Sequence, residues 1–257
     1  FNQGSLRILE GTTFSANSAA VGGGALYDAG WLSVSTSSFF SNTAGGGGAI
    51  TVDQANTGAS IGQTVFGGNG SNCDGGAIYA ARPVTVGTSE LYGNQAGLEC
   101  TDPALGGAIF VEGGVTLTSS ALHDNVSVAG GAIGILGNLN SPKTVEIRNS
   151  AIYSNSAMMA GAVAIGGPSV TRIEQSSIYS NTATIVGGIA SGYGGATIDI
   201  VNSTLAGNSS TYWASALLVA GGNVLENNAG FGPDTLTLRN ITIAGNEFDV
   251  ARRPTRL

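Results

Sequence analysis

The side chains with the clearest chemical potential form a row of aromatic residues. Tyr92, His123, Tyr153 and Tyr179 each follow an apolar residue, stand two positions before an asparagine, and lie 31, 30 and 26 residues apart. Such a row can stack on sugar rings, so these four residues are the candidate ligand-binding site. The competing interpretation is that the rings stack on one another, worth about 0.5–1.5 kcal/mol per pair, without any ligand. His123 is the only histidine, so a metal site with several histidine ligands is excluded.

The carboxylates are the second set of residues that could do chemistry. A polysaccharide lyase or glycoside hydrolase needs clustered carboxylates, with a basic residue nearby in the lyases. The sixteen acidic residues are instead spread along the chain. Asp28, Asp53 and Glu112 follow Gly-Gly-Ala motifs by three or four residues, where they are either a weak cation site or solvated turn residues. We therefore predict no catalytic residues, no metal and no cofactor.

The aromatic row belongs to a repeat that extends along the chain. An apolar-x-x-Asn signal recurs nine times, at intervals of 25 to 38 residues, and many copies are followed by Gly-Gly-Ala-apolar. Segments with apolar residues at every second position, such as Val84–Val86 and Val145–Ile147, precede the signal and indicate strands. The pattern predicts an all-β fold, a right-handed parallel β-helix of about nine coils. Residues 1–246 would form this single domain, with 247–257 as a C-terminal tail or cap.

Stacking explains why these residue types recur. Equivalent positions of neighbouring coils lie about 4.8 Å apart, so asparagines at a bend can form a hydrogen-bonded ladder. The paired glycines provide positive φ angles or close backbone approach. We assign the structural ladder to Asn17, Asn42, Asn69, Asn94, Asn125, Asn155, Asn181, Asn208 and Asn246.

Charged residues give a check on this register. It places Glu146, Arg172 and Asp199 on consecutive coils, so that their signs alternate, as a stable parallel stack requires. Charges also interrupt the threonine column that an ice-binding surface would need. These residues are interpreted as a solvated ladder without a catalytic role.

The two cysteines, Cys73 and Cys100, precede Gly-Gly motifs on adjacent coils and so occupy the same variable loop. A disulfide between them would fit an oxidising compartment and contribute about 3–4 kcal/mol in the chain-entropy model. The alternative is a pair of free thiols.

Composition excludes several classes of protein. The chain has 257 residues, a formal net charge of -7 and one lysine, Lys143, which argues against a nucleic-acid partner. No run of 18 apolar residues is present, so no transmembrane helix is predicted. The first residue is Phe1 rather than methionine, and we expect the sequence to be part of a longer precursor.

Together, the Gly-Gly-Ala-Ile and Phe-x-x-Asn motifs resemble the repeats of polymorphic outer-membrane proteins. The segment from Leu236 to Asn246 is also similar to secreted pectate-lyase-like repeat proteins. The resemblance covers almost the whole chain and implies an extracellular or cell-surface location with an adhesive or scaffolding role. We therefore expect a non-enzymatic surface β-helix that binds glycans or host cell-surface molecules, or self-associates head to tail. A polysaccharide lyase or glycoside hydrolase is the alternative.

Overall fold

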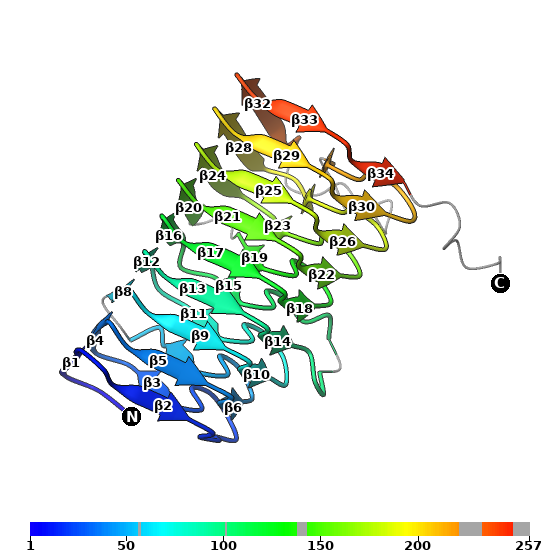
Figure 1. Cartoon of the computed structure of the whole chain (residues 1–257). Helices are drawn as coiled ribbons and strands as arrows, with labels where there is room; N and C mark the ends of the chain where they lie inside the picture. Colours follow the sequence, from blue (N-terminus) through cyan, green and yellow to red (C-terminus); the bar gives the residue numbers. More distant parts are fainter. Residues whose placement is uncertain (56–57, 101, 138–142, 221–232, 249–257) are drawn as a thin grey trace.

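The chain folds as one stack of parallel strands in a computed structural model that describes residues 1–55, 58–100, 102–137, 143–220 and 233–248. Every strand pairs in parallel with its equivalent in the next coil, and the coils rise from the N-terminal to the C-terminal end (Figure 1). The described residues contain strands and no helix. The predicted all-β parallel β-helix is confirmed. Among the described residues, no helix is long and apolar enough to cross a membrane.

Most coils contribute one strand to each of four sheets, which we call A, B, C and D; the first coil has no strand in sheet D and the last has none described in sheet A. Sheets B and C have nine strands, and A and D have eight. Sheet A contains β3 (Leu26–Asp28), β7 (Ile50–Val52), β11 (Ile78–Ala80), β15 (Ile109–Val111), β19 (Ile133–Leu136), β23 (Val163–Gly166), β27 (Ile189–Gly192) and β31 (Leu217–Val219). Sheet B contains β1 (Ser5–Ile8), β4 (Trp31–Ser35), β8 (Gly58–Gly62), β12 (Val84–Gly87), β16 (Val115–Thr118), β20 (Lys143–Arg148), β24 (Ser169–Glu174), β28 (Ala196–Val201) and β32 (Thr235–Arg239).

Sheets C and D follow sheet B in every coil. Sheet C contains β2 (Thr13–Ser15), β5 (Ser38–Phe40), β9 (Val65–Gly67), β13 (Glu90–Tyr92), β17 (Ala121–His123), β21 (Ala151–Tyr153), β25 (Ser177–Tyr179), β29 (Thr204–Ala206) and β33 (Thr242–Ala244). Sheet D contains β6 (Thr43–Ala44), β10 (Gly70–Ser71), β14 (Gln95–Ala96), β18 (Val126–Ser127), β22 (Ser156–Ala157), β26 (Thr182–Ala183), β30 (Ser209–Ser210) and β34 (Glu247–Phe248). Strand β34 lies just beyond the predicted boundary at 246, and residues 249–257 of the predicted cap lie outside the described residues.

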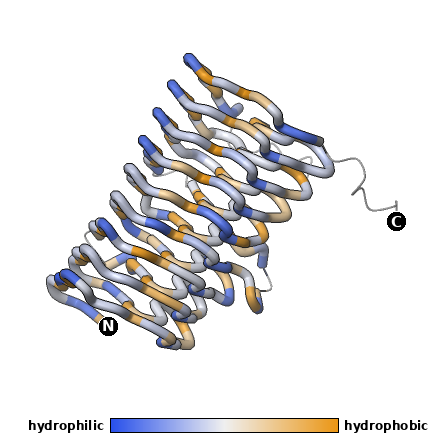
Figure 2. The backbone as a smooth tube through the Cα atoms, in the orientation of Figure 1, coloured by the Kyte–Doolittle hydropathy of each residue, from blue (hydrophilic) through white to orange (hydrophobic). Residues whose placement is uncertain are grey.

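The core is a set of apolar columns that run through the stack. Apolar segments recur at equivalent places in successive coils (Figure 2), because the inward positions of each strand alternate with outward ones. At the N-terminal end, the rings of Phe14, Phe39 and Phe66 stack inside sheet C with centroids 4.8 and 4.9 Å apart. Phe39 and Phe66 are fully buried. Like residues therefore pack on like residues from coil to coil.

The asparagines form a continuous ladder at the bend between sheets C and D. Each side-chain Nδ2 donates to the Oδ1 atom of the next asparagine at 2.8 to 3.0 Å, and the backbone N–H donates to the same oxygen at 2.9 to 3.1 Å. From Asn42 to Asn246, Nδ2 also donates to a carbonyl on the preceding coil. From Asn42 to Asn208 these side chains are fully buried. The ladder gives hydrogen-bond partners to buried polar groups, and without these partners their burial would cost free energy.

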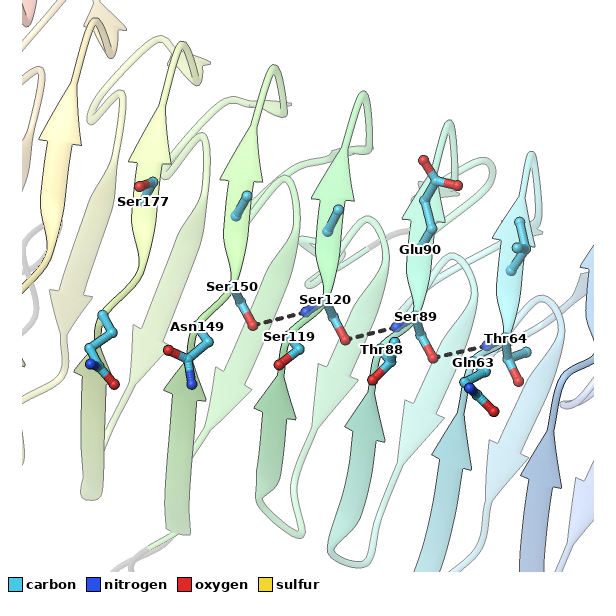
Figure 3. Close-up of a pocket in the computed structure, with 14 residues that line it drawn as sticks. Gln63, Thr64, Thr88, Ser89, Glu90, Ser119, Ser120, Asn149, Ser150 and Ser177 are labelled. Atoms are coloured by element: carbon cyan, nitrogen blue, oxygen red, sulfur yellow. Dashed lines mark hydrogen bonds between the residues drawn. The ribbon is translucent and has the colours of Figure 1, made fainter.

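A second ladder at the bend between sheets B and C was not predicted from the sequence. The backbone N–H of each residue from Thr64 to Ser176 donates to the hydroxyl of the next member at 3.1 to 3.2 Å (Figure 3). Each hydroxyl donates to the carbonyl two residues earlier in its own coil. A signal for it exists, because a serine or threonine stands two positions before the apolar residue of apolar-x-x-Asn in eight successive copies. The first is Thr12, whose hydroxyl donates to the carbonyl of Leu9 instead. The ladder members are Ser37, Thr64, Ser89, Ser120, Ser150, Ser176 and Ser203.

The two positions of each glycine pair require glycine for different structural reasons. The first glycine of the pair has a positive φ, as at Gly106 (+70°). The second leaves no room for a side chain, because a Cβ atom at Gly107 would lie 2.1 Å from the carbonyl oxygen of Gly131. Two later copies replace the first glycine by Ala160 or Val186 and keep the second as Gly161 or Gly187, whereas the following copy replaces both, by Ala214 and Ser215. Where a copy keeps one glycine of the pair, it keeps the one in backbone contact with the next coil.

Loops and charges follow the same register. Cys73 and Cys100 form a disulfide with their Cα atoms 4.9 Å apart.

On the outer face of sheet B, Glu146 aligns with Arg172, and Arg172 with Asp199, as neighbours on consecutive coils. Arg239 on the next coil contacts Asp199 at 2.8 Å. The signs of these neighbouring charges alternate along the stack.

Substitution of a ladder asparagine should be strongly destabilising. Asn125→Ala removes the oxygen that accepts from the backbone N–H and Nδ2 of Asn94, and the donor to Oδ1 of Asn155. A buried group without a partner costs about 1–3 kcal/mol, so we expect a loss above about 3 kcal/mol in the free energy of unfolding. Urea unfolding followed by circular dichroism would measure it. The exposed Gln95→Ala is the control, and an equal loss in both variants would contradict the ladder's role.

Tight contact between coils predicts a large difference between two glycine substitutions. Gly107→Ala would force its Cβ against the backbone of Gly131 and Val126, whereas Gly62→Ala has no heavy atom within 3.8 Å and no positive φ. We expect Gly107→Ala to lower the thermal unfolding midpoint by several degrees or to prevent folding. Gly62→Ala should fold with a nearly unchanged midpoint. If Gly107→Ala were tolerated equally well, close backbone approach would not be what retains this glycine.

Candidate ligand-binding groove on sheet C

The outward face of sheet C carries two columns of side chains, because residues two apart on a strand share a face. The third strand position holds the aromatic row predicted from the sequence, and β-pairing aligns Tyr92, His123, Tyr153 and Tyr179 on four consecutive coils. The first position of the same strands holds Glu90, Ala121, Ala151 and Ser177. The row is thus bordered on one side by mostly small residues.

The aromatic rings stack on one another. Neighbouring centroids lie 5.5, 4.7 and 5.0 Å apart from Tyr92 to Tyr179, with interplanar angles of 7° to 11°. The two faces of His123 and of Tyr153 are therefore covered by neighbouring rings. A ligand approaching the middle of the row meets ring edges and phenolic hydroxyls, so sugar stacking on a ring face is restricted to the ends of the row.

Gly67 marks the N-terminal end of the row. A Cβ atom at this position would lie 2.9 Å from the hydroxyl end of Tyr92 and 3.0 Å from the ring of Phe40. Phe40 stands in the same column one coil before Gly67 and two coils before Tyr92. The side chains of Tyr92 and Phe40 both approach the place that a side chain at Gly67 would fill.

His123 is held between two carboxylates. Its Nδ1 lies 2.7 Å from Oδ2 of Asp124 and its Nε2 lies 3.1 Å from Oε1 of Glu90, while its side chain is 14% exposed. Burial lowers the pKa of His123, but the hydrogen bonds and negative charges of Asp124 and Glu90 outweigh this effect and raise the pKa overall. Both ring nitrogens therefore have carboxylate partners.

Burial also raises the pKa of the Tyr153 phenol, and the nearby Tyr179, Glu90 and Asp124 raise it further. This phenol is therefore neutral at physiological pH. A neutral phenol can donate and accept hydrogen bonds. The edge of the row is consequently a polar, uncharged surface at Tyr153.

A groove of about 690 Å³ runs beside the row, along the bend between sheets B and C. Its residues come from equivalent positions on five consecutive coils and lie side by side (Figure 3). The wall away from the row consists of exposed residues with φ near +50°: Gln63, Thr88, Ser119, Asn149 and Gln175. Ser89, Ser120 and Ser150 of the serine ladder also line it. This groove was not predicted from the sequence, because it arises where two sheets meet.

The acidic residues do not assemble a catalytic or cation site. Asp28 aligns with Val52, is fully buried and accepts a hydrogen bond from Asn2. Asp53 and Glu112 follow the aligned Val52 and Val111, so they occupy equivalent positions two coils apart, and both raise the pKa of Tyr79 on the coil between them. Asp28 does not belong to this column. Within the described residues, no three histidine, cysteine or acidic side chains are placed to hold a metal ion.

These features define a class, the β-solenoid repeat proteins. Residues 11–29 and 63–81 match the Chlamydia polymorphic membrane protein repeat, and both segments span a Phe-x-x-Asn signal and the following Gly-Gly-Ala. The predicted resemblance is confirmed for these two segments. No curated protein and no solved structure matches the chain. The repeat and the β-solenoid fit a structural protein of a cell surface.

The environment of His123 predicts a measurable titration. Because its folded pKa is raised above 6.5, protonation adds stability that is full below the unfolded pKa and disappears as the pH rises through the folded value. Since the chain has one histidine, its proton resonance can be followed alone by NMR. We expect a midpoint above 6.5, and a lower one in Glu90→Gln. His123→Phe should keep the ring stack and lose this part of the pH dependence of unfolding. A midpoint below 6.5 would contradict this arrangement.

Proposed function

We propose that this protein is a non-enzymatic, surface-displayed β-helix that binds glycans on the outer face of sheet C. The observation that carries the proposal is the pairing of the groove with the aromatic row along the same coils. Hydroxyl and amide groups line the groove, and the phenols stand on the same face of sheet C, one column beyond the lining residues. Glycans are recognised by this combination of polar groups and aromatic surface.

The match to a membrane-protein repeat supports display at a surface. The disulfide between Cys73 and Cys100 supports an oxidising location outside the cytosol. Both observations agree with a protein that meets extracellular ligands. The long ladders make the scaffold rigid, which suits a display or adhesive element.

Binding without cleavage is favoured by the content of the groove. Glu90 is the one carboxylate among its lining residues, and it contacts His123. Glycoside hydrolysis uses two carboxylates flanking the scissile bond, and the lining residues provide one. The groove is therefore better suited to holding a saccharide than to cleaving it.

A glycan array probed with the labelled chain tests this function. We expect binding to a restricted set of glycans, and a loss of about tenfold or more in affinity for Tyr153→Ala/Tyr179→Ala, because the proposed contacts of the ligand with the phenols beside the groove are removed. Thr85→Ala/Thr116→Ala on sheet B is the matched control and should bind as the unchanged chain does. Full binding by the folded tyrosine variant would remove the row from the ligand site. Absence of binding to any glycan would refute the function.

A further inference from the structure

The groove repeats the same chemistry once per coil. Each of five coils contributes an exposed hydroxyl or amide side chain with φ near +50°, and a first-position residue of sheet C, Val65, Glu90, Ala121, Ala151 or Ser177. Adjacent strands lie about 4.8 Å apart, which is close to the length of one sugar unit in an extended chain. A ligand that uses all five coils must itself be a repeating chain that runs along the stack and across the strands.

The charge of the groove selects among such chains. Its lining residues include one carboxylate, Glu90, and no lysine or arginine. Asp124 lies close by against His123, and the chain as a whole carries a formal charge of -7. A polyanion placed here would meet repulsion with no cation on the groove to offset it. Uronate-containing and sulfated polymers are therefore disfavoured.

The backbone around the groove argues against a peptide ligand. The strands of sheets B and C that flank it are paired in parallel on both sides, from β8 to β24 and from β9 to β25. A peptide that binds by strand addition needs an unpaired sheet edge. The groove offers side chains instead, and these are the hydroxyl and amide groups that hydrogen-bond sugar hydroxyls.

We propose that the ligand of the groove is a neutral, unbranched glycan chain lying along the β-helix axis, with about one sugar unit per coil. This inference rests on the proposed glycan-binding function and specifies its ligand class and orientation. Gln63, Thr88, Ser119, Asn149 and Gln175 provide the hydrogen bonds that repeat along the chain. On the side of sheet C the groove is lined by the first-position residues, and the aromatic row lies one column beyond them.

The test is calorimetry with neutral oligosaccharides of increasing length, namely cello-, laminari- and manno-oligosaccharides, against oligogalacturonates and heparin oligosaccharides of equal length. We expect the affinity for at least one neutral series to rise with each added unit and to level off near the pentamer. Acidic series should bind more weakly. Tighter binding of the acidic series, weakened by salt, would overturn the neutral ligand class while leaving the proposed function standing. Binding of no series, together with a silent glycan array, would remove both.

A pair of variants tests the orientation. Asn149→Gly/Gln175→Gly removes two groove side chains and keeps the positive φ that each position requires. We expect about a tenfold loss of affinity for the pentamer and a smaller loss for the dimer. Ser154→Gly/Ser180→Gly is the matched control, since both serines are exposed, have φ of +54° and lie on the same two coils at the other end of sheet C. Equal losses for the dimer and the pentamer, or in the control, would contradict a chain that spans the coils.

Discussion

The stacking of equivalent residues at the spacing of one strand is the constraint on which the rest of this molecule depends. Because every coil must present its hydrogen-bonding groups to the next, a buried position repeats its residue type along the axis. The asparagine ladder is the strongest expression of this rule, since each amide bridges two coils and also anchors the backbone of the preceding one. Loss of one member exposes the bonding groups of two neighbours, which makes the ladder a cooperative element.

The same rule shapes the outer surface. Columns of aromatic residues stack ring on ring, and columns of charged residues alternate in sign, because each side chain's closest neighbour is its equivalent one coil away. Residues that a sequence suggests as ligand contacts are thus first partners of one another. His123 illustrates this, because its ring faces are covered by Tyr92 and Tyr153 and both its nitrogens by carboxylates. What remains for a ligand is the edge of the column and the groove beside it.

The groove depends on the bends between sheets. At the bend from sheet B to sheet C, one residue per coil has a positive φ and its side chain is exposed, while the next residue is buried in the serine ladder. The ladder therefore fixes the spacing of the exposed side chains. A structural hydrogen-bond network thereby produces a regular polar surface, and regularity is what a polymeric ligand can use. Binding along such a surface requires no catalytic residue and no movement of the scaffold.

The repeat alone was enough to predict the fold, the register and the asparagine ladder, because equivalent residues of successive copies must be neighbours in the stack. It also placed Cys73 and Cys100 in one loop and aligned the aromatic row. The folded coils were needed to see that the interior rings of the row cover one another, that Asp28 is buried outside the column of Asp53 and Glu112, and that a groove exists. Periodicity gives the order of residues along the stack. The direction of a side chain and the shape between two sheets depend instead on the bend angles, which only the folded coil defines.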